Sequence, residues 1–169
     1  YKDTLTAEEQ ADVLAYLLAN GFRGKVKLIY IDPPFDSGAD YVRTVNLRGG
    51  TIALDGESYG LGEQIQYADI WANDNYLQFM YERLIIIREL LSEDGSLYLH
   101  CDWHRNHFLR DLLDEVFGTE YFRNEIIWQR TASHNDPGRY GVIHDTVFFY
   151  SKGSDYIWNN PKVPQSQEY

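Results

Sequence analysis

Hydrophobic positions along the chain predict an opening helix followed by a strand. Residues 7–20 are rich in Ala and Leu, follow the capping-box pair Thr6 and Glu9, and stop at Gly21, which predicts a helix. Residues 26–31 are almost continuously apolar and β-branched, as in a strand that is covered on both faces of a parallel sheet. This order is typical of an α/β fold.

Later segments repeat the same pattern. Apolar side chains recur at three- and four-residue steps over residues 76–91 and predict a helix whose inward face holds Leu77, Met80, Tyr81, Leu84, Ile87 and Leu91. The turn Glu93-Asp94-Gly95 ends this helix, and residues 96–101 form a short strand. Residues 103–117 predict another amphipathic helix, with an inward face of Phe108, Leu112, Leu113 and Val116. Further strands are predicted at 125–130 and 146–152, separated by the polar stretch 131–141.

Between residues 37 and 75 the chain is rich in Gly, Asp and Tyr and has little periodicity. A hairpin is predicted there, with residues 41–47 pairing with 51–54 across Arg48-Gly49-Gly50. Long irregular segments in compact domains are usually functional or mobile.

Composition limits the class of protein. The 169 residues are 44% hydrophobic, which fits one globular unit, and no run approaches the roughly 18 apolar residues of a membrane span. Cys101 is the only cysteine, so an intrachain disulfide and a multi-cysteine zinc site are excluded. The chain starts without Met or a signal-peptide pattern, so we expect a cytoplasmic protein and a piece of a longer chain. The net charge of -11 disfavours a broad phosphate-binding surface, so basic residues that bind nucleic-acid phosphates would form a local patch or lie outside this chain.

The candidate chemistry lies in Asp32-Pro33-Pro34-Phe35, which follows the first strand. Ligands of open α/β sheets bind beyond the carboxyl ends of strands, where this loop emerges. The prolines fix their own φ angles and lack N–H donors, so the loop presents carbonyls and one carboxylate. Phe35 adds a flat apolar surface on which a base can stack. These residues suit an aromatic ring that carries an NH2 group, although a stiff turn explains the four residues alone equally well.

The surrounding motifs resemble the β-class amino methyltransferases of DNA, in particular the modification subunits of type III restriction systems and related adenine methylases. The resemblance covers the chain from about residue 25 onward, in the family's order. It rests on Lys27 to Phe35, Tyr67-x-Asp69-x-Trp71, the helix with Arg83-Leu84 and Leu90-Leu91, Gly95 to Asp102, Phe117-Gly118, Ile126-Ile127-Trp128, His144-Asp145 and Tyr150-Ser151-Lys152.

This resemblance implies a Rossmann-like methyltransferase fold, three-layered with a mostly parallel sheet. It also implies transfer of a methyl group from S-adenosylmethionine to the exocyclic amino group of adenine in DNA, without a metal. Asp32 and the carbonyl of Pro33 would hold the amino group, and Phe35 would stack on a flipped-out base; Pro34 completes the motif. Asp32 and Pro33 are also the candidate contacts to the cofactor. The family further implies DNA, and either a restriction subunit or a second copy of the chain, as partners.

One family element is missing from the sequence. The glycine-rich cofactor loop, Phe-x-Gly-x-Gly after a strand, has no counterpart, and Gly60-Leu61-Gly62 lacks the flanking strand and helix. We therefore expect an incomplete fold: residues 1–160 form the catalytic part of a prokaryotic DNA methylase, and 161–169 are a tail or the start of a target-recognition region.

Other polar residues are weaker candidates. His100, Asp102, His104 and His107 are close in sequence, but His100 points away from Cys101 on a strand, and His104 and His107 fall on the first turn of the next helix, so we predict no metal site. Asp102 either lines the pocket or, as we favour, caps that helix. The other candidate contacts to substrate or DNA are Tyr67, Trp71, Arg130, His134 and His144, with Ser133, Asn135 and Arg139 in the same loop as His134.

Alternative functions remain open from the sequence. The same loop could methylate the amino group of cytosine, although Asp at position 32 is more typical of adenine enzymes. It could also act on RNA or on a protein amide. A non-catalytic DNA-binding or assembly module is the alternative from another class, which the acidic charge disfavours.

Overall fold

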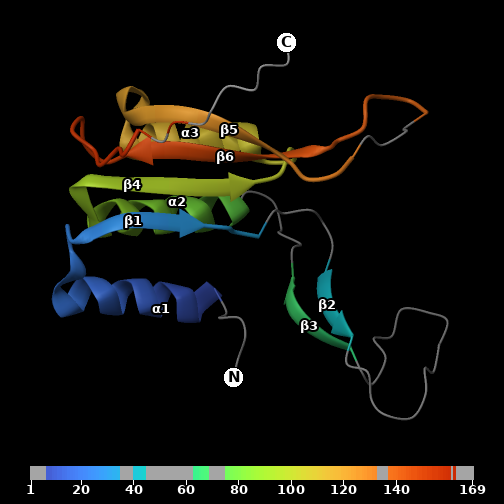
Figure 1. Cartoon of the computed structure of the whole chain (residues 1–169). Helices are drawn as coiled ribbons and strands as arrows, with labels where there is room; N and C mark the ends of the chain where they lie inside the picture. Colours follow the sequence, from blue (N-terminus) through green and yellow to red (C-terminus); the bar gives the residue numbers. More distant parts are fainter. Residues whose placement is uncertain are drawn as a thin grey trace.

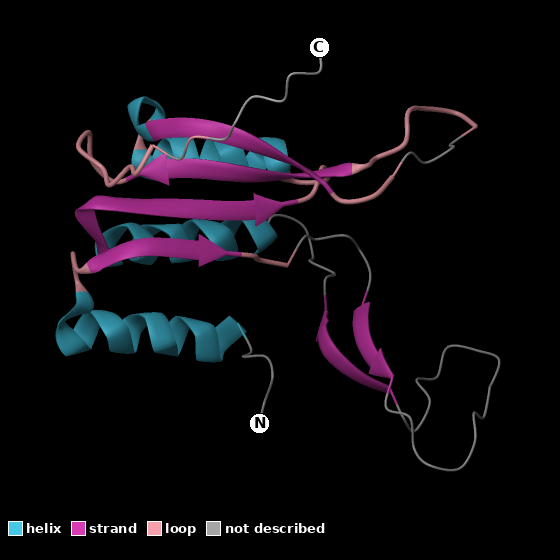
Figure 2. Ribbon diagram, in the orientation of Figure 1, coloured by secondary structure: helices cyan, strands magenta, loops and turns pink. Residues whose placement is uncertain are grey.

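A four-stranded sheet backed by helices organises the chain (Figures 1 and 2). The structure is a computed structural model, and it describes residues 7–34, 40–44, 63–68, 75–132, 137–160 and 162. The strands lie in the order β1 (Val26–Ile31), β4 (Leu91–Cys101), β6 (His144–Ser151) and β5 (Phe122–Gln129). Both strands predicted after residue 120 are therefore present, with bounds shifted toward the N-terminus.

Strand directions bring several chain segments to one end of this sheet. β1 pairs with β4 in parallel, whereas β6 is antiparallel to both β4 and β5. Three strands therefore run in one direction and β6 runs against them, so the described sheet is mixed, with one parallel and two antiparallel pairings, whereas a mostly parallel sheet was predicted. As a result, the first residues of β6 lie at the same edge as the last residues of the other three strands (Figure 1).

Helices cover one face of the sheet. α1 (Ala7–Leu17) continues into a short π-helical turn, η1 (Leu18–Phe22), in which Gly21 takes a positive φ of 83°. α2 (Asn75–Leu90) and α3 (Asn106–Phe117) lie behind the strands in Figure 1, and η2 (Thr119–Tyr121) follows α3. The core joins α2 and α3 to β4 and β6; among its fully buried members are Leu84, Leu97, Leu99, Leu109, Leu113 and Tyr150. No helix among the described residues is long and apolar enough to cross a membrane.

The opposite face of β1 is open in the described part of the chain. Leu28 and Tyr30 are 61% and 58% exposed, so the prediction that this strand is covered on both faces is wrong for these residues. The described segments supply two of the three expected layers. β1 also has β4 as its one partner strand among the described residues. A continuous apolar run shows only that a strand tolerates burial, because the covering layer must come from another segment.

The predicted start of α3 was wrong, and of its predicted inward face Leu113 is buried and Leu112 and Val116 pack against the core, whereas Phe108 does not belong to it. The helix begins at Asn106 rather than at residue 103, so His104 precedes it in a turn. The buried stripe consists of Leu109, Leu113 and Phe117, spaced four residues apart, whereas Phe108 is 38% exposed.

A separate two-stranded sheet pairs β2 (Asp40–Thr44) with β3 (Glu63–Ala68) in antiparallel fashion. The predicted partner, residues 51–54, lies outside the described residues, and the observed partner of β2 is β3 instead. β3 has the alternating pattern Gln-Ile-Gln-Tyr, which is a signal for a strand. The sequence interpretation predicted no strand at these residues.

Candidate active site

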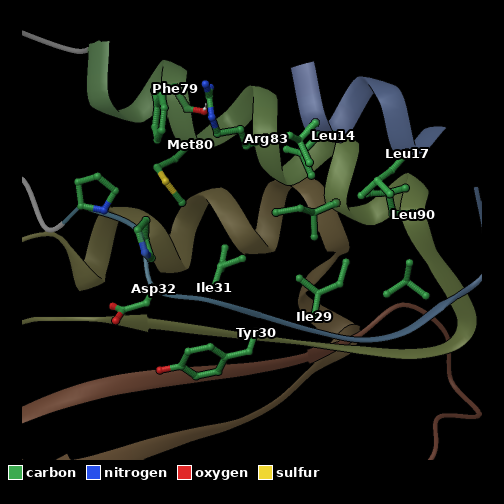
Figure 3. A pocket seen from close by; sticks show the side chains of 15 residues that line it. Leu14, Leu17, Ile29, Tyr30, Ile31, Asp32, Phe79, Met80, Arg83 and Leu90 are labelled. Atoms are coloured by element: carbon green, nitrogen blue, oxygen red, sulfur yellow. Dashed lines mark hydrogen bonds between the residues drawn. The ribbon is translucent and has the colours of Figure 1, made fainter. Parts of the chain in front are cut away.

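β1 ends in the loop that the sequence singles out. The parallel sheet runs regularly to Ile31, which pairs with Leu99, and the two prolines that follow cannot continue the ladder. The Asp32 side chain is 54% exposed, while Pro33 and Pro34 are half-buried. In Figure 3 the side chains of Ile29 and Ile31 point toward the helices, whereas those of Tyr30 and Asp32 lie away from them. Phe35, the fourth residue of the motif, lies outside the described residues.

An apolar cavity of about 480 Å³ adjoins this loop, between α1, α2 and β1 (Figure 3). Two of the described residues that line it carry charged side chains, Asp32 directly after β1 and Arg83 on α2. The guanidinium of Arg83 lies 3.5 Å from the centre of the Phe79 ring, and its Nη1 donates to the Phe79 carbonyl at 3.0 Å. Burial lowers the pKa of Arg83. The volume of the cavity is in the range of small-molecule sites.

A line of ionisable side chains, Asp32, His100, Asp145 and Arg130, crosses the end of the sheet. The His100 ring has its Nδ1 at 3.1 Å from Oδ1 of Asp32 and its Nε2 at 3.4 Å from Oδ2 of Asp145. Nη1 of Arg130 lies 3.4 Å from the other oxygen of Asp145. Solvent exposure differs strongly along this line of side chains. The side chains of Asp145 and His100 are 3% and 18% exposed, whereas that of Arg130 is 47% exposed.

Asp102 has a local structural role. Its carboxylate accepts a hydrogen bond from the backbone N–H of His104 at 2.9 Å, and its second oxygen lies 2.6 Å from Nδ1 of the His104 ring. The predicted helix cap is wrong, because α3 begins at Asn106 and Arg105 occupies the cap position without a side-chain hydrogen bond. Asp102 stabilises the turn that leads into the helix, although it stands at the same edge of the sheet as Asp32.

The remaining predicted contacts are spread more widely. Trp71 and His134 lie outside the described residues, and Tyr67 is placed by its backbone in β3, opposite Tyr41. His144 opens β6 and pairs in register with Gln129. Of the predicted contacts that the structure describes, Arg130 therefore joins the line of ionisable side chains at Asp32.

The sequence interpretation missed His100 and Asp145 as site residues. From the sequence, His100 was considered only as a possible metal ligand, and Asp145 was named only as part of the motif His144-Asp145. Their positions were nevertheless informative, because one stands near the end of β4 and the other near the start of β6. No group of three His, Cys, Asp or Glu side chains suited to a metal occurs in the part of the chain that the structure describes.

Comparisons with known proteins identify the family to which this chain is similar. The chain is 35% identical over 145 residues to the type II methyltransferase M.EcaI of Enterobacter cloacae, covering 85% of this chain and 28% of that protein. It is 30% identical over 156 residues to the Mod subunit of the type III restriction-modification enzyme EcoP15I of Escherichia coli, covering 88% and 24%. The chain thus spans about a quarter of the length of these relatives.

A solved structure and a family model complete the comparison. The M1.HpyAVI–SAM complex superimposes with a TM-score of 0.53 at 16% identity, over 92% of this chain and 58% of the other. This supports an incomplete Rossmann-like methyltransferase fold, as the motifs predicted. The family model described as DNA methylase matches residues 26–169. The chain carries the family's motifs over most of its length, and it belongs to the DNA methylase family.

Proposed function

We propose that this protein methylates the exocyclic amino group of adenine in DNA, with S-adenosylmethionine as the methyl donor. The observation that carries the proposal is the Asp32-Pro33-Pro34 loop, which presents a half-exposed carboxylate and two prolines without N–H donors beside a cavity. Membership of the DNA methylase family supports the reaction class. The relatives named as a methyltransferase and as a Mod subunit support the same class.

The loop suits an amino nucleophile. An aromatic amine is a weak nucleophile because its lone pair is delocalised into the ring. Asp32 and the carbonyl of Pro33 would accept the two N–H groups and favour a tetrahedral nitrogen, and the carboxylate would stabilise the positive charge that develops there. Phe35 would stack on the extruded base, whose reacting nitrogen is otherwise paired within the duplex.

The described residues fit the reacting end of the cofactor. The half-exposed carboxylate of Asp32 suits a sulfonium cation. S-adenosylmethionine, when bound, supplies a methyl group whose bond to sulfur breaks as the amino nitrogen bonds to the methyl carbon, leaving a neutral thioether and releasing a proton. We propose that residues outside those described hold the rest of the cofactor, since the sequence has no Phe-x-Gly-x-Gly loop.

We further propose that residues 1–160 act as the catalytic part of a larger methylase domain. Two observations support this proposal. The side of β1 that faces away from β4 has no partner strand among the described residues, and the chain spans about a quarter of the length of its relatives. The Mod names of several relatives favour a restriction subunit or a second copy of the chain as partner.

The test is methyl transfer by the intact protein from labelled S-adenosylmethionine to duplex DNA. We expect Asp32→Ala to lower the rate by about 10²–10³-fold, because it removes a group that contacts the reacting nitrogen. Asp12→Ala, on the exposed side of α1, is the matched control and should keep the wild-type rate. Chromatography of the hydrolysed product separates N6-methyladenine from N4-methylcytosine. Equal rates for wild type and Asp32→Ala would refute the assignment of the loop.

A further inference from the structure

We propose that His100 is a positioning residue that orients the carboxylate of Asp32 for methyl transfer, and that Asp145 and Arg130 in turn hold His100. This inference rests on the proposed function of the Asp32 loop and deepens it. The observation behind it is the line of ionisable side chains that runs from Asp32 in the exposed loop through His100 to the buried carboxylate of Asp145.

Each of the four groups comes from a different strand of one sheet. Asp32 directly follows β1, His100 is the penultimate residue of β4, Asp145 is the second residue of β6, and Arg130 directly follows β5. Strand pairing fixes His100 and Asp145 in the sheet, and Asp32 and Arg130 each follow directly after a paired residue, so the line is anchored at the end of the sheet. A rigid support of this kind is what keeps a reacting group in a narrow range of orientations.

The chemistry of the ring fits a bridge between two carboxylates. An ionised carboxylate only accepts hydrogen bonds, so the ring can serve both neighbours only through its two nitrogens, and each nitrogen lies within ion-pair distance of one carboxylate. Nδ1 faces one oxygen of Asp32, and Nε2 faces Asp145. With one oxygen of Asp32 held in this way, the other remains available for the amino group of the base. Without His100, a carboxylate that is 54% exposed would be held mainly by water.

A purely structural role for His100 is the competing explanation. Asp145 is almost fully buried, and a buried charge requires a partner, so His100 could serve only to stabilise the fold. The two explanations differ in their kinetic consequences. A structural histidine affects the stability of the protein, whereas a positioning histidine also affects kcat through the nitrogen that faces Asp32.

The experiment compares His100→Asn, His100→Gln and His100→Leu in the intact protein. The Asn amide reaches the position of Nδ1 and can contact Asp32, whereas the Gln amide reaches that of Nε2 and can contact Asp145. We expect His100→Leu and His100→Gln to lower kcat by about 10- to 100-fold, and His100→Asn to recover most of it, because small misplacements of reacting groups cost rates of this order. KM for DNA and for S-adenosylmethionine should change by less than about threefold.

His107→Asn is the matched control. His107 is exposed near the start of α3, outside the charged line, and the same substitution there should leave kcat unchanged. Equal losses in His100→Asn and His100→Gln, or wild-type kcat in all three His100 variants, would overturn the proposal. If His100→Leu fails to fold, the comparison of the Asn and Gln variants still decides.

A spectroscopic measurement separates this inference from the proposed function. In the 15N spectrum of the imidazole, Asp32→Asn should shift Nδ1 of His100 more than Nε2, and Asp145→Asn should do the reverse. If the wild-type protein transfers no methyl group to DNA while these shifts occur, the proposed function fails and the bridge stands. If neither substitution moves its nitrogen, the bridge itself is refuted.

Discussion

Removing one hydroxyl group from the core tests how α3 is attached to the sheet. Tyr150 on β6 is fully buried, and its hydroxyl donates to Oδ1 of Asp114 on α3 at 2.5 Å. The other oxygen of Asp114 accepts from Nε of Arg110 at 3.0 Å. Tyr150→Phe deletes the hydroxyl and leaves the ring packed against Phe117 and Phe122.

The expected loss of stability follows from these contacts. A hydrogen bond to a charged acceptor contributes about 1.5–3 kcal/mol. Asp114 keeps Arg110 as a partner and its side chain is 21% exposed, so water can reach the vacated oxygen. We therefore expect Tyr150→Phe to lower the free energy of unfolding by about 1.5 kcal/mol, at the lower end of that range.

Urea unfolding of the purified protein measures this difference. Tyr140→Phe is the matched control, because Tyr140 is 99% exposed and loss of its hydroxyl should change stability by less than about 0.5 kcal/mol. Both variants should keep the wild-type dependence on urea concentration, since neither changes the surface buried on folding. If Tyr150→Phe and Tyr140→Phe unfold at the same midpoint, the buried hydrogen bond makes no net contribution and the reasoning fails.

Two further predictions concern ionisation of the core. Burial, reinforced by the nearby charges of Asp102 and Asp145, raises the pKa of the Cys101 thiol to about 12, so a disulfide reagent at pH 8 should label it about 10²–10³-fold more slowly in the native protein than in urea. Equal labelling rates would contradict this. The pKa of Tyr150 is also raised, by burial and then by its bond to Asp114. Because both groups have folded pKa values above their unfolded ones, the contribution of each group to stability is complete below its unfolded pKa and falls above it, from about pH 9 for Cys101 and from about pH 10 for Tyr150. The loss is about 1.4 kcal/mol per pH unit for each group, and a urea midpoint that stays constant from pH 9 to 11 would refute it.

Local signals were sufficient for the part of the site that lies in one segment. β1 has the predicted bounds, because its apolar run is delimited by the Arg23-Gly24-Lys25 turn on one side and by Pro33 on the other. The Asp32-Pro33-Pro34 loop, to which we assign the chemistry, was located for the same reason. Its chemistry depends on adjacent residues, and adjacent residues can be identified without knowing the fold.

The partners of Asp32 could not be predicted in this way. His100 was correctly expected on the opposite face from Cys101, yet its function depends on which strands lie on either side of β4. Periodicity specifies the face of a strand on which a side chain lies but not the neighbouring strand. The open face of β1 was mispredicted on the same grounds, since a layer contributed by another segment leaves no trace in the strand's own sequence.

The reversed direction of β6 explains how the site is assembled. In a wholly parallel sheet, the residues beside Asp32 would all come from the ends of strands, and each would be followed by a loop. Because β6 runs against its neighbours, it brings its beginning to this edge and places Asp145 inside the sheet, where it is 2% exposed. A buried carboxylate in a strand that pairs with a neighbour on each side is a firmer support for His100 than a loop residue would be. The antiparallel strand therefore gives the exposed loop of Asp32 an indirect attachment to the interior of the sheet.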